Sequence, residues 1–339
     1  MKFSEAIKQS TLRALKENKK FILFGLEVTN EGVGFVEKFP KQVFETPVSE
    51  LSSTGLVVGM ATRGFKPTIV YGRVEFALLA FDQILTQAGR WNYMFGGNYP
   101  CPAKFRIQIG RQWGNGPQHT ANYHSAMMQC SEIDIFIPST PFEAYTQNLY
   151  MSKSNTPSIL LEHRYLNLLE EEFKVPKNIK KIDTTKIFNS KKKDILFVTY
   201  AETLPIALQA RKILRGENIY ASIINFSYFP ARKRFLKKDL EYINKFKKIL
   251  LIDGSSFEFG VLSGICSEIA IKLKNKEIHK ISSNNSPAPS SPKLMNKHYV
   301  NKNDIILKIN EILNSRIKIE KISFEESVLW PNIDLKEFK

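Results

Sequence analysis

Short apolar runs alternate along this chain with segments of about 10–15 residues whose apolar positions have a helical spacing. In the first half the runs lie at 21–24, 68–71, 105–109 and 158–161, and the pattern starts again at 195. Strands that are joined by crossover helices pair in parallel. The alternation therefore predicts an α/β fold with two doubly wound domains and mostly parallel sheets.

The charge distribution supports a division into two domains. Residues 1–170 carry 17 Lys and Arg against 14 Asp and Glu, whereas the remainder carries 32 against 19. A chain of 339 residues is long enough to form two separate cores. We expect a first domain at 1–170, an irregular charged linker at 171–193, a second domain at 194–325 and a tail at 326–339.

The net charge of +16 raises the question of an anionic partner. The lysines occur in short runs, such as 191–193, at the edges of apolar strands, and no stacking aromatics are interleaved with them. Such runs are typical of a solvated surface rather than a nucleic-acid groove. We therefore expect no nucleic-acid partner, and a basic face that meets an acidic protein is the alternative.

Cysteine use and hydropathy indicate a compartment. The three cysteines are far apart and include no CxxC pair, so neither a disulfide framework nor a zinc site is indicated. The N-terminal segment lacks the apolar core of a signal peptide, and no run approaches the ~20 apolar residues of a membrane span. These features favour a cytoplasmic protein with no membrane association.

The stretch 47–83 is the strongest candidate for chemistry. Glu50 stands at the start of an apolar segment with Gly55 and Gly59, and Phe76 lies in a following aromatic segment. Glycines on a buried helix indicate that another element packs closely against it. A carboxylate at the head of such a helix is a candidate for a protonated, hydrogen-bonding role. The stretch therefore predicts a binding site for one end of a flat heterocyclic cofactor.

Structural alternatives exist for these residues. Glu50 could serve only as a dipole partner of its helix, with Ser49 as the cap. Phe76 could be a core residue. His119 follows a glycine-rich loop at 110–119, which favours a functional role, and the loop lacks the Gly-Lys-Ser/Thr ending of a phosphate-binding P-loop. We expect His124 and His163 to be structural.

The order of four motifs is specific: PVSE at 47–50, VEFALLAFDQI at 74–84, QHT at 118–120 and PSTP at 138–141. It resembles the beta subunit of thiamine-diphosphate-dependent 2-oxoacid dehydrogenases, which act on pyruvate or branched-chain 2-oxo acids. The segment 194–210 resembles the start of the second, transketolase C-terminal-like domain of this family, after the pyrimidine-binding domain. Val70 and His124 depart from the family pattern, which has acidic residues there.

The resemblance implies roles for four residues. Glu50 would contact the aminopyrimidine of the cofactor and favour its imino tautomer, and Leu51 would lie near the cofactor through its backbone. Phe76 would pack on the pyrimidine ring. His119 would orient the substrate carboxylate or move protons during acyl transfer to a lipoyl group.

The resemblance also implies partners. The family binds the diphosphate through magnesium with a Gly-Asp-Gly motif, which this sequence lacks, so we expect no metal ligands here. A separate alpha subunit would hold thiamine diphosphate's other end and the magnesium, in an alpha2beta2 heterotetramer in which beta chains also pair. A lipoyl-bearing acyltransferase is a further expected partner.

The expected function is therefore oxidative decarboxylation of a 2-oxo acid by an oxidoreductase. Two alternatives stay open. One is a subunit of a split transketolase-like or carboligase enzyme in specialised sugar metabolism. The other is a non-catalytic partner or scaffold protein, against which the joint presence of Glu50, Phe76 and His119 argues.

Overall fold

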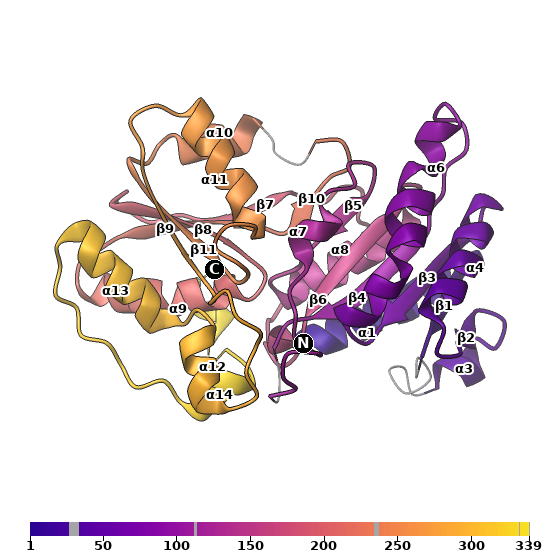
Figure 1. Cartoon of the computed structure of the whole chain (residues 1–339), viewed down its shortest axis with the longest axis horizontal. Coiled ribbons are helices and arrows are strands. Elements are labelled where there is room, and N and C mark those ends of the chain that lie inside the picture. Colours follow the sequence, from indigo (N-terminus) through magenta and orange to yellow (C-terminus); the bar gives the residue numbers. More distant parts are fainter. Residues whose placement is uncertain (27–33, 112–113, 234–236, 332, 339) are drawn as a thin grey trace.

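A computed structural model describes residues 1–26, 34–111, 114–233, 237–331 and 333–338. The described chain forms two sheets that lie side by side, the first built mainly by the N-terminal half and the second by the C-terminal half (Figure 1). This arrangement confirms the predicted α/β class with mostly parallel sheets. No helix in the described ranges is long and apolar enough to cross a membrane.

The first sheet has seven strands in the order β10-β5-β6-β4-β3-β1-β2, and all its pairs are parallel except β10 with β5. Its strands are β1 (Phe21–Gly25), β2 (Val43–Glu45), β3 (Lys66–Tyr71), β4 (Lys104–Ile109), β5 (Asp134–Phe136), β6 (Ser158–His163) and β10 (Tyr228–Phe229). The inner strands β1, β4 and β6 are buried almost throughout, as expected for a parallel sheet that is covered on both faces.

Helices of the first half cover both faces of this sheet. They are α1 (Phe3–Glu17), α3 (Phe35–Lys38), α4 (Glu50–Thr62), α5 (Val74–Ala77), η1 (Leu78–Ala80), η2 (Asp82–Ala88), α6 (Gly89–Met94), α7 (His124–Met127), α8 (Pro141–Lys153) and η3 (Arg164–Leu166). Helix α8 begins as its sequence predicts, because the Thr140 hydroxyl accepts a hydrogen bond from the Glu143 amide at 3.2 Å and Pro141 is the first helical residue.

The segment that the sequence predicts as one helix over 75–91 is helical but not uniform. It passes from α5 through the 3₁₀ turn η1 into the π-helix η2 and then into α6. Departures from α-helical pitch are frequent beside functional sites, because they re-aim side chains on one face. Phe76 lies at the α-helical start of this segment.

The second sheet has the order β12-β11-β8-β9-β7, and only β7 runs antiparallel to its neighbour. Its strands are β7 (Thr185–Phe188), β8 (Ile195–Tyr200), β9 (Ala221–Phe226), β11 (Lys248–Asp253) and β12 (Glu277–Ser282). Its helices are α9 (Thr203–Gly216), α10 (Lys237–Ile243), α11 (Val261–Lys272), α12 (Pro292–His298), α13 (Lys302–Leu313), α14 (Phe324–Val328) and η4 (Leu335–Phe338).

One expectation for the second half is wrong. The segment 171–193 is not wholly irregular, because it contains β7, which pairs antiparallel with β9. Main-chain pairing of this kind is not visible in the sequence of the segment. Helix α9 has Glu202 at its N-cap position, and the Thr203 hydroxyl donates to the Tyr200 carbonyl at 2.7 Å.

The C-terminal segment packs back onto the first half. The Tyr165 hydroxyl donates to the Glu326 carbonyl, and the Arg111 guanidinium donates to the Ser327 carbonyl at 3.1 Å. The guanidinium also lies over the rings of Tyr165 and Tyr299, at 4.0 and 4.6 Å from their centres. The two larger hydrophobic clusters each include residues of both sheets, so the halves share continuous packing.

Candidate active site

A cavity of about 280 Å³ lies where β3 ends and the chain turns into α5. It brings together three of the four site residues that the sequence predicts, Glu50, Phe76 and His119. The rest of its lining comes from β3, from neighbouring loops and from Ser53 on α4; the β3 and loop residues are Leu26, Thr46, Pro47, Ile69, Val70, Tyr71, Gly72 and Arg73. The carboxyl ends of parallel strands are where ligands bind in folds of this class.

Glu50 is the first residue of α4 and is half-buried at the cavity. The Thr54 hydroxyl bonds to the Glu50 carbonyl and to the Tyr71 hydroxyl, which fixes the start of the helix against β3. Burial raises the pKa of Tyr71, and the nearby Glu50 charge raises it further, so this phenol stays protonated. Ser49 makes no side-chain capping bond, so the capping alternative for this end of the helix lacks its hydrogen bond.

Phe76 and His119 form one aromatic wall of the cavity. Their ring centres are 5.9 Å apart and the rings are perpendicular, an edge-to-face contact. Phe76 is half-buried rather than part of the core, which leaves ring surface available to a ligand. Leu51, the fourth predicted residue, does not line the cavity; its side chain is 55% exposed on the outer face of α4.

The loop that carries His119 is held by charged groups on both sides. The buried Arg164 guanidinium donates to the carbonyls of Gly110 and His119, and burial lowers the pKa of Arg164 to about 10. The Glu75 carboxylate accepts a hydrogen bond from the Ala121 amide at 2.9 Å. These contacts place the imidazole of His119 opposite the start of α5.

Close packing explains the glycines of this loop. A Cβ on Gly110 would overlap the His163 ring, and one on Gly114 would lie 2.6 Å from the Ser290 carbonyl oxygen. Both glycines have positive φ, of 74° and 64°. The loop therefore contacts both halves of the chain, and the Asn122 amide adds a hydrogen bond to the Gly254 carbonyl at 3.0 Å.

Arg73 is a cavity residue that the sequence did not single out. Burial lowers its pKa and the Glu75 carboxylate partly offsets that effect, so it remains a cation in the cavity that Glu50 and His119 also line. Its position three residues before Phe76, in a segment already assigned to the site, was the signal that could have identified it.

The two histidines that the sequence predicts to be structural lie at the junction of the two sheets. His163 Nε2 is 3.3 Å from a carboxylate oxygen of the buried Glu202. His124 is fully buried, and its pKa is lowered to about 4 because burial disfavours the charged ring. Neither lines the Glu50 cavity; each contacts the second half, His163 through Glu202 and His124 through an edge-to-face contact with the Tyr200 ring.

Potential metal ligands do not cluster in the described ranges, where no three His, Cys, Asp or Glu side chains are grouped to hold an ion. Asp253 illustrates why. Its buried carboxylate accepts hydrogen bonds from the Tyr200 hydroxyl and the Leu262 amide and pairs with Lys280 at 3.3 Å. Its oxygens are thus engaged within the chain.

Comparison with known proteins gives consistent results. Residues 1–168 match the transketolase pyrimidine-binding domain family. The chain is 26% identical over 322 residues to the pyruvate dehydrogenase E1 component subunit beta of Rickettsia felis, covering 91% of this chain and 97% of that protein. It is also 26% identical over 265 residues to the acetoin:2,6-dichlorophenolindophenol oxidoreductase subunit beta of Cupriavidus necator, covering 77% of each chain.

A solved structure supports the fold. The chain superposes with a TM-score of 0.74 and 18% identity on a structure described as a split gene transketolase, inactive beta4 tetramer, covering 91% of this chain and 97% of that one. These findings confirm the resemblance that the sequence motifs indicated. The chain carries a transketolase-type pyrimidine-binding domain at residues 1–168 and is related over most of its length to the beta subunits of the 2-oxoacid dehydrogenase family, which are oxidoreductase components.

Proposed function

We propose that this chain is the beta subunit of a thiamine-diphosphate-dependent 2-oxo acid dehydrogenase and binds the aminopyrimidine end of the cofactor in the Glu50 cavity. The observation that carries the proposal is the convergence of Glu50, Phe76 and His119, which lie up to 69 positions apart in the sequence, on one cavity. A scaffold protein has no need for this combination.

The residues present fit one end of the cofactor. The cavity is slightly smaller than the ~300–1,000 Å³ typical of a complete small-molecule site, and it combines a carboxylate with a half-buried aromatic ring. A carboxyl group can hydrogen-bond a pyrimidine nitrogen, and a phenyl ring can stack on the heterocycle. The diphosphate end and its magnesium would be held by another chain, because this sequence lacks the Gly-Asp-Gly motif of the family.

The outer face of α4 favours a partner chain as that source. Gly55 and Gly59 are exposed there, and no atom outside the adjoining residues and backbone of α4 would lie within 4 Å of a Cβ built on either. Leu51 and Leu56 on the same face are each 55% exposed. We infer that an alpha subunit with the diphosphate and magnesium site, or a second beta chain, covers this face in an alpha2beta2 assembly. Leu51 would then reach the cofactor through its backbone.

Each side chain of the cavity has a role in this proposal. When bound, the cofactor would supply nucleophilic and electron-accepting chemistry for decarboxylation of a 2-oxo acid. Glu50 holds the proton at the pyrimidine nitrogen. Phe76 fixes the plane of the ring. His119 and Arg73 present cationic or donor groups that orient the substrate carboxylate, and the acyl group passes to a lipoyl acceptor.

The proposal includes the domain arrangement. Residues 1–170 form the pyrimidine-binding unit and 194–325 the transketolase C-terminal-like unit, with the glycine-rich loop contacting both. The proposed location is the cytoplasm, which three unpaired cysteines favour.

The test is reconstitution. The chain is purified with a partner that contains Gly-Asp-Gly, supplied with thiamine diphosphate and magnesium, and assayed for decarboxylation of pyruvate and 2-oxoisovalerate with a dye acceptor. Turnover that requires both chains supports the proposal. Absence of turnover with every 2-oxo acid, or tight cofactor binding by this chain alone, contradicts it.

Arg73 is also compatible with one alternative function, that of a split transketolase-like enzyme. A guanidinium in the cavity suits a phosphate ester as well as a carboxylate, as a split transketolase-like enzyme acting on sugar phosphates would require. The same reconstituted enzyme is therefore offered ketose phosphates with an aldose acceptor. Transfer of a two-carbon unit without decarboxylation of any 2-oxo acid would favour this alternative.

A further inference from the structure

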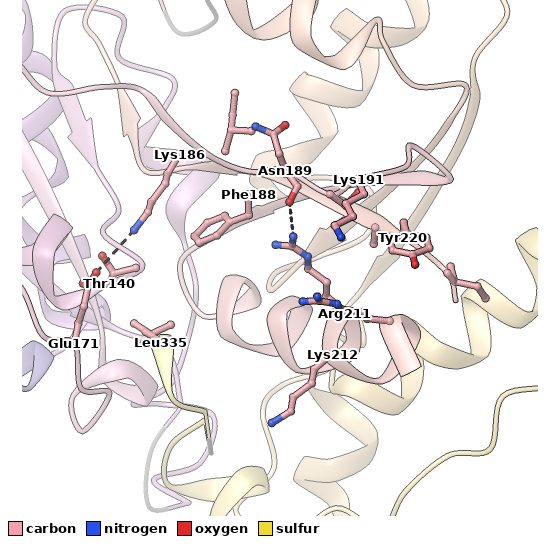
Figure 2. Close-up of a pocket in the computed structure, with 15 residues that line it drawn as sticks. Thr140, Glu171, Lys186, Phe188, Asn189, Lys191, Arg211, Lys212, Tyr220 and Leu335 are labelled. Atoms are coloured by element: carbon pink, nitrogen blue, oxygen red, sulfur yellow. Dashed lines mark hydrogen bonds and ion pairs between the residues drawn. The ribbon is translucent and has the colours of Figure 1, made fainter. Parts of the chain in front are cut away.

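A second and larger cavity, of about 690 Å³, lies in the second half of the chain. It is bounded by β7 and the residues after it, by one face of α9 and by the start of β9, and the first half contributes Thr140 and Glu171 (Figure 2). Leu335, from the C-terminal segment, closes one side. It shares no lining residue with the Glu50 cavity.

The lining of this basic cavity contains five cationic side chains and one acidic side chain: Lys186, Lys191, Arg211, Lys212, Arg215 and Glu171. The acid is already engaged, because Glu171 pairs with Lys186 at 3.8 Å and accepts a hydrogen bond from the Phe142 amide at 2.9 Å. Lys186 also lies over the Phe188 ring, at 5.2 Å from its centre. Glu171 therefore does not neutralise the other cationic side chains that line the cavity.

Arg211 and Arg215 are one turn apart on α9, so their like charges face the cavity together. Within the described ranges, no carboxylate lies at ion-pair distance from Arg211, Arg215 or Lys191. Arg211 is half-buried, and burial together with the Arg215 charge lowers its pKa. The repulsion between the two guanidinium groups destabilises this arrangement, and a bound anion would offset that repulsion.

The geometry orients part of this cluster. The Arg211 guanidinium donates to the Asn189 carbonyl across the cavity, as Figure 2 shows, which fixes its plane while other N–H groups remain to donate. Tyr220 lies in the same wall and is half-buried. Paired guanidinium groups with an aromatic neighbour match a phosphate group that is attached to an organic body.

We propose that this basic cavity binds a small phosphorylated metabolite, with Arg211 and Arg215 on the phosphate and the organic part against Tyr220. The size of the cavity falls within the range for a complete small-molecule ligand. Because the lining joins both halves and the C-terminal segment, an occupant would tie the three parts together. The site is separate from the proposed catalytic cavity, so its existence does not depend on the proposed function.

The experiment is calorimetric titration of the full chain at low ionic strength, with inorganic phosphate, adenosine monophosphate and citrate as probes. We expect one saturable site, tighter for the organic phosphate than for inorganic phosphate and weakest for citrate. Arg215→Gln, at an exposed position, should weaken binding about tenfold, as should Arg211→Gln.

Two controls make the result specific. Arg316→Gln removes the same charge from a position outside the cavity and should leave the affinity unchanged. Arg73→Gln tests whether phosphate enters the other cavity and should also have no effect. No saturable binding, equal weakening by Arg316→Gln, an unchanged affinity in Arg215→Gln or a preference for citrate would each overturn the proposal. Because Arg215 is exposed, its variant keeps the test valid if Arg211→Gln fails to fold.

Discussion

Two pairs of glycines flank the candidate active site, and they differ in what surrounds them. Gly110 and Gly114, in the loop that leads to His119, are crowded by other parts of the chain and have positive φ. For Gly55 and Gly59, on the helix that Glu50 begins, no atom outside the adjoining residues and backbone of that helix lies within 4 Å of the point that a Cβ would occupy. The loop glycines are explained by contacts within the chain. The helix glycines have no such contact within the described chain, and in the proposed assembly a partner chain would cover them.

The largest effect on activity is expected at Glu50, the first residue of α4. Glu50→Ala should lower the activity of the reconstituted enzyme about 100-fold or more, because it removes the proton-holding group from the cavity. Assembly should persist, since the Glu50 carboxylate forms no ion pair within the described part of the chain, and size-exclusion chromatography measures this directly. Glu5→Ala is the matched control, because Glu5 is also an acid in the first turn of a helix.

Equal activity losses in the two variants would show that Glu50 acts only on its helix dipole. Full activity of Glu50→Ala would show that another carboxylate has the catalytic role.

The next effect concerns the crowded loop. Gly110→Ala should lower the free energy of unfolding by about 3 kcal/mol, because a Cβ would overlap the His163 ring and the residue would keep a left-handed φ. Urea denaturation measures the change. Gly64→Ala is the control: Gly64 has φ of 84° but open space around it, so it should cost only about 1 kcal/mol. Equal losses would show that the crowding contributes nothing.

A pH-dependent effect tests the strand that carries this loop. Lys104 begins β4, is fully buried, and donates to the Thr156 carbonyl at 2.5 Å. Burial lowers its pKa from 10.5 to about 7. Above pH 7 the unfolded chain keeps a proton that the folded chain has released, so stability should rise with pH, by about 2 kcal/mol between pH 7 and 8.5.

Lys104→Met should remove this rise, which urea denaturation at several pH values would detect, whereas the exposed Lys41→Met should keep it. Parallel pH profiles for the wild-type chain and Lys104→Met would contradict the lowered pKa.

The smallest effect distinguishes the two glycine pairs most directly. Gly55→Ala should raise the stability of the isolated chain by about 0.5–1 kcal/mol, because alanine is the better helix former and has room. The same change should weaken assembly with the alpha partner, measured by analytical ultracentrifugation. If Gly55→Ala destabilised the isolated chain or left assembly unchanged, Gly55 would not differ from Gly110 in the way proposed.

Local rules account for much of what the sequence predicted. The Thr140 cap acts over three residues, and each inner strand is a short apolar run between helices, so both could be identified without tertiary information. Glu50 and Phe76 meet because β3 connects their helices directly. Their roles, however, came from family motifs rather than from spacing.

What the sequence missed depends on distant contacts. Strand β7 is a charged, partly exposed edge that is defined by β9, about 35 residues later. Arg73 is a single cation whose importance comes only from the cavity around it. The docking of Ser327 and Glu326 onto the first half joins residues more than 150 positions apart, which no local pattern encodes.

The short strand β10 has a consequence for how this protein can evolve. It belongs to the second half of the chain but pairs with β5 and ends the first sheet. If the halves were separated, the main-chain groups of β5 would be left as an open edge, ready to pair with other chains. Recombination that exchanges one half for a foreign one must therefore also supply this two-residue strand, or the product will tend to aggregate.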